Sequence, residues 1–293
     1  MKKVLVTGAT GFIGSYVIDD LLSRGYQVIA SSSNRETATQ KKWFNQVKFI
    51  EMDLKRIDST LNYFNYFDSP DLMIHLAWEG LPNYLDEFHV SDNLPRHKLF
   101  LKNMIQNGLK DLTVTGTCFE YGMLNGCLNE EMEVEPANPY AIAKNRLWKY
   151  LELLSLDLPF SLKWVRLFYM YGEGQNPKSL FSQLDKAIEE NHKIFNMSGG
   201  MQIRDFLPVN EMAENIVSIA IQNKVLGIVN CCSGEPIMVK DFVINYLKEK
   251  NKNIQLNLGY YKYADYEPME FWGDNNKLNK IGNGIKSFKG SVD

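Results

Sequence analysis

Cysteine is scarce in this sequence. The 293 residues include only four cysteines, Cys118, Cys127, Cys231 and Cys232. No C-x-x-C pair occurs among them, and the adjacent Cys231 and Cys232 have a poor spacing for zinc. We therefore expect reduced thiols, no metal site and a cytoplasmic protein.

A basic excess is also missing. Lysine and arginine number 32 against 35 acidic residues, which gives a net charge of -3 and an isoelectric point of about 5.9. A nucleic-acid-binding surface normally carries surplus positive charge, so no nucleic-acid partner is expected. A small basic site for a phosphorylated ligand is still compatible with this balance.

Long apolar runs are absent as well, so we expect no membrane span. The N-terminal MKKVLVTGATGFIG begins like a signal peptide, but glycines interrupt the apolar run and no cleavage-like site follows. Repeats and low-complexity tracts are missing too. The length suits one large domain or two unequal lobes with a sizeable core.

The first half of the chain alternates short apolar runs with longer amphipathic segments. Strands are expected at 2–8, 27–30, 47–51, 72–76, 112–115 and 161–167, and helices at 12–23, 90–106 and 140–155. Apolar strands separated by helices predict a doubly wound parallel sheet covered on both faces, an α/β fold of the Rossmann type. We expect residues 1–170 to form this dinucleotide-binding domain.

The pattern changes after about residue 171. Helices are expected at 178–190 and 209–222, among short strands and turns. We predict that residues 171–293 form mainly a smaller substrate-binding lobe, interleaved with the first domain. The polar segment 282–293 is expected to be loosely held.

The segment TGATGFIGS (7–15) joins the first strand to the first helix. Gly8 permits a tight turn, Gly11 lets the backbone approach a pyrophosphate, and Gly14 lets the helix pack on the strand. Free N–H groups at the helix start, at Phe12 and Ile13, then meet the phosphate charge. The segment predicts a dinucleotide site, against the alternative of a plain strand-to-helix turn.

This G-x-x-G-x-x-G spacing resembles that of the short-chain dehydrogenase/reductase superfamily, especially its extended branch, the NAD-dependent epimerase/dehydratase family. Further segments resemble the same family in the same order: HLAW (75–78), TGTCFEYG (115–122), WVRLFYMYGEGQNP (164–177) and GGMQIRDFLPVNEMA (199–213). The resemblance covers nearly the whole chain, from about residue 3 to 282.

The end of the second strand, IASSSNRE, bears on the choice of cofactor. An acidic residue there would hold the ribose 2′-hydroxyl of NAD, but the chain has Ser31, Ser32 and Ser33, followed by Arg35. Small donors and a positive charge suit a 2′-phosphate, so we expect NADP(H) to be favoured over NAD(H). The alternative is that Arg35 lies on a solvated loop.

The family resemblance implies further cofactor contacts. Asp53, with the adjoining Leu54, is expected at the adenine, and the backbone of Leu76 and Ala77 is expected to line the cofactor. His75 is interpreted as a packed strand residue rather than a catalyst.

Tyr140 and Lys144 form a Y-x-x-x-K pair, and a spacing of four places both side chains on one face of a helix. A nearby ammonium lowers the pKa of a phenol, and lowering it from about 10 toward 7 takes on the order of 4 kcal/mol. A second copy, Tyr246 and Lys250, lies in a lysine-rich segment and is interpreted as a solvated helix face. By resemblance, Tyr140 and Lys144 are catalytic, Lys144 also contacts the cofactor, and Thr117 hydrogen-bonds the substrate oxygen.

The residues after Thr117 limit which of the family's reactions the chain can carry out. Nucleotide-sugar dehydratases of this family carry an Asp-Glu pair where this chain has Cys118 and Phe119, and a phenyl ring cannot do acid–base work. Epimerase-reductases similar to GDP-fucose synthase place a cysteine one residue later than Cys118. Glu120 stands at a usually apolar position, as a salt-bridged structural carboxylate or as a substrate contact. The remaining hydroxyl, phenol and ammonium suit reduction of a ketone or oxidation of an alcohol.

Two later segments carry expected substrate contacts, which join those of Thr117 and Tyr140. Tyr169 replaces the asparagine with which the family contacts the sugar nucleotide. Arg204 matches the residue that pairs with the substrate pyrophosphate, a role that suits a planar guanidinium. An ordinary surface pair between Arg204 and Asp205 is the alternative.

The resemblance implies an NADPH-dependent reduction of a nucleotide-linked 4-keto-6-deoxyhexose, giving a dTDP-fucose-type sugar for surface polysaccharide. Hydride would go to C4, and Tyr140 would donate the proton to O4. A nucleotide-sugar 4-epimerase with retained NAD is the alternative, and a non-catalytic NADP-sensing protein is a more distant one. A homodimer formed through two helices of each subunit is the family expectation.

Overall fold

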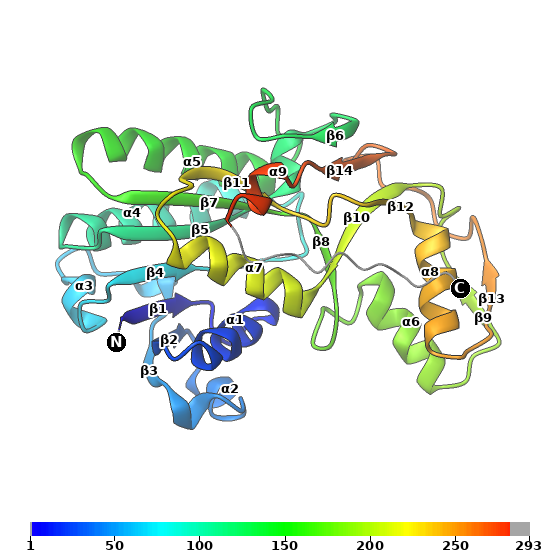
Figure 1. The fold of residues 1–293 in the computed structure, drawn as a ribbon, viewed down its shortest axis with the longest axis horizontal. Helices are drawn as coiled ribbons and strands as arrows, with labels where there is room; N and C mark the ends of the chain where they lie inside the picture. Colours follow the sequence, from blue (N-terminus) through cyan, green and yellow to red (C-terminus); the bar gives the residue numbers. More distant parts are fainter. Residues whose placement is uncertain (1, 282–293) are drawn as a thin grey trace.

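The computed structural model describes residues 2–281, so the segment 282–293, expected to be loosely held, lies outside the described residues. A seven-stranded sheet with the order β11-β7-β5-β4-β1-β2-β3 runs through the molecule (Figure 1). All neighbouring strands of this sheet are parallel. The strands are β1 (Lys3–Thr7), β2 (Gln27–Ser32), β3 (Lys48–Glu51), β4 (Leu72–His75), β5 (Asp111–Thr117), β7 (Ser161–Leu167) and β11 (Gly227–Cys231).

Helices cover both faces of this sheet. In β1, Val4 and Val6 belong to one buried cluster and Leu5 to another, because successive side chains of a strand point to opposite faces. The first cluster is covered by α1 (Phe12–Ser23) and α7 (Val209–Ile221), and the second by α4 (Leu94–Gln106) and α5 (Pro139–Asp157). The predicted doubly wound α/β fold of the Rossmann type is confirmed.

The helix expected at 90–106 begins differently from the prediction. A short π-helical segment, η3 (His89–Asn93), comes first and leads directly into α4. Pro95 lies in the first turn of α4 and has no N–H to donate to an earlier carbonyl. The change of helix type at this point is consistent with that missing donor, because a wider turn leaves other N–H groups to make the bonds.

Most of the chain beyond β7, apart from α7 and β11, builds a second, smaller assembly, which Figure 1 shows at the end of the molecule away from β1 to β4. A three-stranded sheet has the order β12-β10-β8, and β9 pairs with β13. Phe181 and Val243 are buried where the two helices of this part pack together. Its elements are β8 (Tyr169–Tyr171), α6 (Leu180–Glu189), β9 (Ile194–Asn196), β10 (Ile203–Pro208), β12 (Pro236–Met238), α8 (Val239–Glu249) and β13 (Gln255–Asn257).

Several short elements complete the described chain. They are α2 (Arg35–Thr39), η1 (Phe44–Gln46), η2 (Leu54–Arg56), α3 (Tyr63–Tyr66), η4 (Cys118–Tyr121), β6 (Gly126–Leu128), β14 (Phe271–Gly273) and α9 (Asn276–Asn279). β14 pairs with β6, which ties the end of the described chain to the segment after β5. Within residues 2–281, no helix is both long and apolar enough to cross a membrane.

Candidate active site

The glycine loop between β1 and α1 closely approaches the loop after β4. Gly8 has a φ of +73°, and a Cβ placed on it would lie 2.7 Å from the backbone nitrogen of Ala77. A Cβ on Gly14 would lie 2.3 Å from the carbonyl oxygen of Gly8. The N-cap residue of α1 is Gly11, which has no side chain to cap the helix. The N–H groups at the start of α1 are therefore left for a ligand, as anion sites at helix N-termini require.

Two adjoining cavities follow the carboxyl ends of the central strands. The smaller has a volume of about 220 Å³ and the larger about 500 Å³. Both are lined by Gly8, Gly11, Leu76 and Trp78, so they meet at the glycine loop. An extended ligand with a pyrophosphate at its middle fits this groove, because ligands of open parallel sheets bind outside the carboxyl ends of the strands.

The smaller cavity gathers the residues expected at the adenine end of the cofactor. Ser32, Asp53, Leu54 and Ala77 all line it. The Asp53 carboxylate accepts the backbone N–H of Lys55 at 2.9 Å, which starts η2 and fixes the carboxylate at the cavity wall. The structure thus brings these four predicted residues together.

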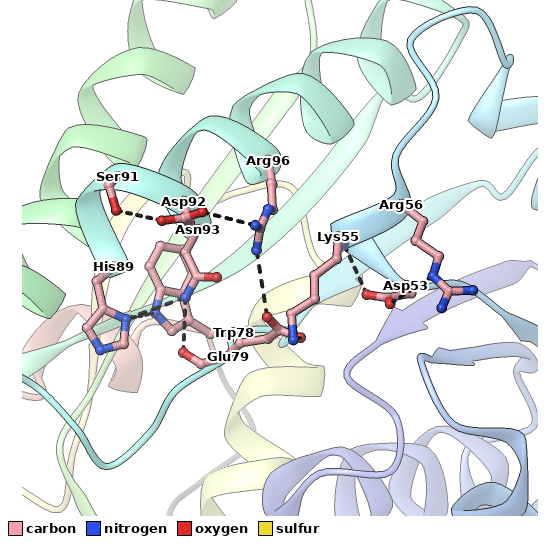
Figure 2. A network of polar contacts seen from close by, with 10 residues as sticks. All are labelled: Asp53, Lys55, Arg56, Trp78, Glu79, His89, Ser91, Asp92, Asn93 and Arg96. Atoms are coloured by element: carbon pink, nitrogen blue, oxygen red, sulfur yellow. Dashed lines mark hydrogen bonds and ion pairs between the residues drawn. The ribbon is translucent and has the colours of Figure 1, made fainter. Parts of the chain in front are cut away.

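A network of ion pairs surrounds this part of the smaller cavity (Figure 2). Glu79, which lines the cavity, pairs with Lys55 at 3.3 Å and with Arg96 at 3.9 Å. Arg96 also pairs with Asp92 at 3.1 Å. The four side chains come from η2, the loop after β4, η3 and α4, and Glu79 brings this network to the cavity wall.

Arg35 does not take part in this cavity. It is the first residue of α2 and is exposed to solvent. Its guanidinium lies 5.8 Å from the ring centroid of Phe44 and 5.7 Å from that of Phe49. The residues that line the cavity include Ser31, Ser32 and Ser33 but not Arg35. The alternative of an arginine on a solvated segment therefore describes its position.

The larger cavity brings together Thr117 and Tyr140, as predicted. Thr117 ends β5 and Tyr140 lies in the first turn of α5, and both line the cavity. The Thr117 side chain lies close enough to the Tyr140 phenol to lower its pKa. Asn138 caps α5 by accepting the N–H of Ala141, and the Tyr140 N–H donates to the carbonyl of Tyr84 at 3.1 Å. The phenol is thus held by its own backbone as well as by packing.

Burial raises the pKa of the Tyr140 phenol, and Tyr84, Glu120 and Cys118 add to this while the Thr117 side chain opposes it. The sequence instead led us to expect an ammonium that lowers this pKa. Burial also lowers the pKa of Lys144 to about 7, against the opposing effect of Glu120. The Lys144 Nζ lies 6.0 Å from the centroid of the Tyr140 ring. The phenol is therefore neutral at neutral pH in this structure.

Lys144 is more enclosed than the sequence suggested. Its side chain is buried, and its Nζ donates to the carbonyl of Thr115 at 2.8 Å. The ammonium lies 4.1 Å from the centroid of the Trp78 ring. Trp78 lines both cavities, whereas Lys144 is not among the lining residues of either. The indole, and not the ammonium, forms the cavity wall at this point.

Glu120 is fully buried beneath the larger cavity. Its carboxylate accepts hydrogen bonds from Arg166 Nε at 2.9 Å, Trp164 Nε1 at 3.0 Å and the Thr117 backbone N–H at 2.9 Å. Of the two interpretations left open, the structure therefore shows the salt-bridged structural carboxylate. By binding the Thr117 N–H, this carboxylate also fixes the end of β5.

Aromatic rings form the far wall of the larger cavity. The ring of Phe119 lies 5.1 Å from that of Tyr84 and 6.3 Å from those of Tyr169 and Tyr266. Tyr84, Phe119 and Tyr169 line the cavity together with Leu81 and Pro82. The predicted contact at Tyr169 is thus in place as a wall residue, and its hydroxyl donates to Glu267.

Arg204 is not placed as predicted. Its side chain is buried, and its guanidinium donates to the carbonyls of Ile203, Pro268 and Met269 at 2.8 to 3.0 Å. It also pairs with Glu267 at 3.2 Å and does not line the cavity. All of its partners are protein groups, so its donors are engaged within the fold.

Neither does Arg204 form the alternative pair with Asp205. The buried Asp205 carboxylate instead accepts backbone N–H groups of Ser233, Gly234 and Gly273. It therefore stabilises the turn after β11 and its contact with β14. The motif that carries these two residues is built into the fold rather than into the cleft.

The second Y-x-x-x-K copy lies apart from the cleft. Tyr246, on α8, is half-buried and donates its hydroxyl to Asp185 on α6 at 2.7 Å. Lys250 follows the last residue of α8 and is exposed. The interpretation as a solvated helix face holds for the lysine and not for the tyrosine.

Sequence reasoning did not identify Trp78, Tyr84 or Tyr266 as site residues. A signal for Trp78 was present, because it stands in HLAW, one of the segments that resemble the family. Tyr84 and Tyr266 lie in segments without regular structure, and only the folded chain brings their rings to within 6.3 Å of each other.

The parallel sheet and the groove along its carboxyl edge define a dinucleotide-binding enzyme of the Rossmann type. The chain belongs to the NAD dependent epimerase/dehydratase family, whose model matches residues 4–232. It is 30% identical over 276 residues to a dTDP-6-deoxy-L-talose 4-dehydrogenase (NAD(+)) of Aggregatibacter actinomycetemcomitans, with 92% of this chain and 99% of the relative covered.

Solved structures share the fold. A UDP-glucuronic acid 4-epimerase from Bacillus cereus, in complex with UDP-glucuronic acid and NAD, is 24% identical with a TM-score of 0.81, covering 95% of this chain and 92% of that one. MoeE5, in complex with UDP-glucuronic acid and NAD, is 21% identical with a TM-score of 0.79, again covering 95% and 92%.

These comparisons correct the expected cofactor. The relative has NAD(+) in its name, and both solved structures contain NAD. The prediction that NADP(H) is favoured is therefore wrong. Its physical basis also fails, because the guanidinium of Arg35 lies against Phe44 and Phe49 and away from the lining of the smaller cavity.

Proposed function

We propose that the chain is an NAD(H)-dependent 4-ketoreductase of a nucleotide-linked 4-keto-6-deoxyhexose, which can also run as a dehydrogenase in reverse. One observation carries this proposal: the hydroxyl residues Thr117 and Tyr140 line the same cavity as the ring of Phe119. The two hydroxyls can move a proton to or from a sugar oxygen, whereas the phenyl ring can neither add nor remove one. The relative is named as a dTDP-6-deoxy-L-talose 4-dehydrogenase, and this name supports C4 of the sugar as the carbon that is reduced or oxidised.

The protonation of Tyr140 favours the reductive direction. Because burial raises its pKa, the phenol is protonated at neutral pH and can donate its proton to O4 as a ketone becomes an alcohol. Thr117, which lines the same cavity as that phenol, would share the substrate oxygen. The Asn138 cap and the Tyr84 carbonyl hold the start of α5, and with it the phenol, in place.

The groove suits a dinucleotide along its length. The glycine loop would hold the pyrophosphate, Ser32, Asp53 and Leu54 the adenosine, and the backbone of Leu76 and Ala77 the middle of the molecule. A Cβ at Gly8 would fill this cradle, which fits a ligand that needs close approach to the backbone. When bound, the nicotinamide supplies the hydride for the sugar carbon. The rest of the chemistry is proton handling by the residues of the cleft.

The aromatic wall suits a deoxygenated sugar. Tyr84, Phe119 and Tyr169 present ring surface to the larger cavity. A methyl group at C6 gains by packing on such a surface, whereas a hydroxymethyl or carboxylate would lose hydrogen bonds to water there. We therefore place the 6-deoxy carbon at Phe119. The remaining substrate contacts would come mainly from residues 171–293.

The test follows nicotinamide absorbance with NADH and dTDP-4-keto-6-deoxyglucose. We expect one NADH consumed per sugar reduced, and a loss of at least about 100-fold in kcat for Tyr140→Phe, the usual scale of a lost general acid. Tyr246→Phe is the matched control, because it removes a phenol hydroxyl from the other Y-x-x-x-K pair and leaves the cleft intact.

Two results would contradict the proposal. Unchanged activity in Tyr140→Phe would exclude the proton role. Interconversion of UDP-glucose and UDP-galactose with bound NAD, and no net change in absorbance, would assign the chain as a 4-epimerase, which can use the same hydroxyl pair.

We also propose a homodimer. Leu153 and Leu156 of α5 are 64% and 81% exposed, and Leu99 of α4 is 39% exposed. Apolar side chains this exposed on neighbouring helices are typical of a covered surface. Light scattering should give twice the mass of 33.8 kDa, and a value for one chain would exclude the dimer.

A further inference from the structure

Trp78 occupies the point where the two cavities meet. It lines both of them, and its ring centroid lies 4.1 Å from the Nζ of Lys144. The ring also lies 6.1 Å from that of Tyr140, at an angle of 67°. The indole therefore contacts the ammonium and forms part of the wall of both cavities.

The indole is held by a histidine whose hydrogen bonds fix its tautomer. His89 Nε2 lies 3.0 Å from the carbonyl of Asn83, and because a carbonyl only accepts, this nitrogen carries the proton. Nδ1 of His89 is then free to accept the Trp78 Nε1–H at 3.1 Å, and it also lies 3.4 Å from the Asn93 amide nitrogen. Figure 2 shows these three side chains converging, with Asn93 also bonded to the carbonyl of Glu79.

Two more histidines form a hydrogen-bonded pair beside the indole, with His97 against the ring and His75 beyond it. His97 stacks on Trp78 with ring centroids 4.5 Å apart and planes 22° apart. His97 Nδ1 lies 2.7 Å from His75 Nε2, and His75 Nδ1 lies 2.7 Å from the Thr7 hydroxyl. Both imidazoles are buried, and burial lowers the pKa of His75 to about 3. The stack on His97 and the hydrogen bond to His89 thus fix the position of the indole.

The surroundings of the ammonium contain little opposite charge. The titratable groups that face it are His75 of β4, His89 of η3, His97 of α4, Glu120 of η4 and Tyr140 of its own helix. Glu120 is the one anion among these, and it is bonded to Arg166. The contacts that stabilise the buried charge most directly are therefore the Thr115 carbonyl and the indole face.

We propose that Trp78 is a positioning residue for Lys144: its indole face, fixed by His89, holds the ammonium at the junction of the two cavities. This inference rests on the proposed function, in which the proton of Tyr140 moves beside that ammonium. It assigns a role to the tryptophan of HLAW and to the histidines around it.

The first experiment measures kcat and KM for Trp78→Leu and Trp78→Phe. We expect kcat to fall about 30-fold in the leucine variant, the size of a desolvated cation–π contact, with KM for the sugar within about twofold. Phenylalanine keeps a ring face and should recover most of the loss. Trp43→Phe is the control, because Trp43 is a buried indole that lines neither cavity.

The second experiment does not depend on turnover. The 13Cε shift of Lys144, assigned with Lys144→Arg, is followed against pH in the ligand-free protein. Leucine keeps the site buried but removes the ring face that favours the ammonium, so the midpoint should move to lower pH, while phenylalanine should leave it near that of the unmodified protein. If the leucine variant does not fold, His89→Leu frees the indole N–H and should lower kcat about threefold.

The results separate the two proposals. An unchanged Lys144 midpoint in Trp78→Leu, or an equal loss of kcat in the phenylalanine variant, would overturn the role of Trp78. A protein without activity on 4-keto sugars would overturn the proposed function, while the Lys144 titration would still decide the role of the ring.

Discussion

The two ends of the groove are built in different ways. The cofactor end is made of backbone, from the glycine loop at 7–15 and the ends of neighbouring strands. The substrate end is made of side chains, with Tyr84, Phe119, Tyr169 and Tyr266 arriving from four separate segments. A site made of backbone can be recognised from one short stretch of sequence, because the close approach of the backbone requires glycine. A side-chain site leaves no such local mark.

The substrate end depends on the buried ion pair between Arg166 and Glu120. Removing one partner should cause the largest loss of stability among the variants considered. In Arg166→Met the Glu120 carboxylate keeps its bonds to Trp164 and Thr117 but loses its cation. A buried charge without its partner costs about 3–5 kcal/mol of unfolding free energy. Urea unfolding at pH 7 measures this loss.

Lys186→Met provides the control for this ion pair. Lys186 pairs with Glu190 at 3.8 Å, and the two side chains are 70% and 48% exposed. Such surface pairs contribute about 0–1 kcal/mol. A similar loss in the two variants would show that Glu120 does not carry a buried charge.

The cofactor end is tested by a single added methyl group. In Gly8→Ala the new Cβ meets the backbone of Leu76 and Ala77, which cannot move aside as a flexible side chain can. Overpacking of this kind costs about 2 kcal/mol, so we expect NADH to bind about 30-fold more weakly by fluorescence titration. Gly25→Ala has a similar φ, +78°, with nothing within 4 Å of its Cβ, and should keep its affinity.

This difference explains what the sequence could predict. The helix at 12–23 and the strand at 161–167 have the boundaries that were expected, because their apolar patterns are local and clear. Thr117 and Tyr140 were found because motif order fixes which strand end and which helix carry them. The strand ends that form the smaller cavity follow from the parallel sheet alone.

The failures share a physical cause. A guanidinium has several possible partners, and the sequence does not show which lies nearest. Arg204 is surrounded by carbonyls of residues 203, 268 and 269, and the exposed Arg35 lies against two phenylalanine rings. The pKa of Tyr140 was mispredicted for a similar reason, because it depends on burial, which the spacing of residues in the sequence does not show.

Buried histidines lie between the cofactor end and the substrate end of the groove, and they should make the stability of the protein depend on pH. His75 is neutral in the folded protein down to about pH 3, while the unfolded chain binds a proton below about 6.5. The unfolded state therefore gains protons as pH falls below 6.5, and the folded state loses about 1.4 kcal/mol per pH unit from this group. Above pH 6.5 this contribution is fully present.

A variant isolates this contribution. His75→Gln should flatten the slope of unfolding free energy between pH 6 and 5 by about 1.4 kcal/mol per unit. His192→Gln, at an exposed position, should leave the slope unchanged. Equal slopes in the protein and in His75→Gln would show that His75 is not held neutral.

The aromatic wall makes a smaller prediction. Phe119→Ala removes ring surface at the proposed place of C6, and a lost methyl contact of about 0.8 kcal/mol corresponds to roughly a fourfold change. We expect the ratio of kcat/KM between the 4-keto-6-deoxy sugar and its 6-hydroxy analogue to fall by that factor. A ratio that does not change would move the methyl contact away from Phe119.

The smallest effect is expected at Arg35, where the sequence pointed to the cofactor and the structure does not. In Arg35→Ala the ring contacts with Phe44 and Phe49 are lost, but the lining of the smaller cavity is unchanged. An exposed cation–π contact is worth about 0.5–1 kcal/mol to stability, and NADH affinity should stay within about twofold. Titration of NADH and NADPH against both proteins checks this. A selective loss of NADPH binding in the variant would mean that Arg35 reaches the ribose after all, and that the cofactor end also depends on a side chain.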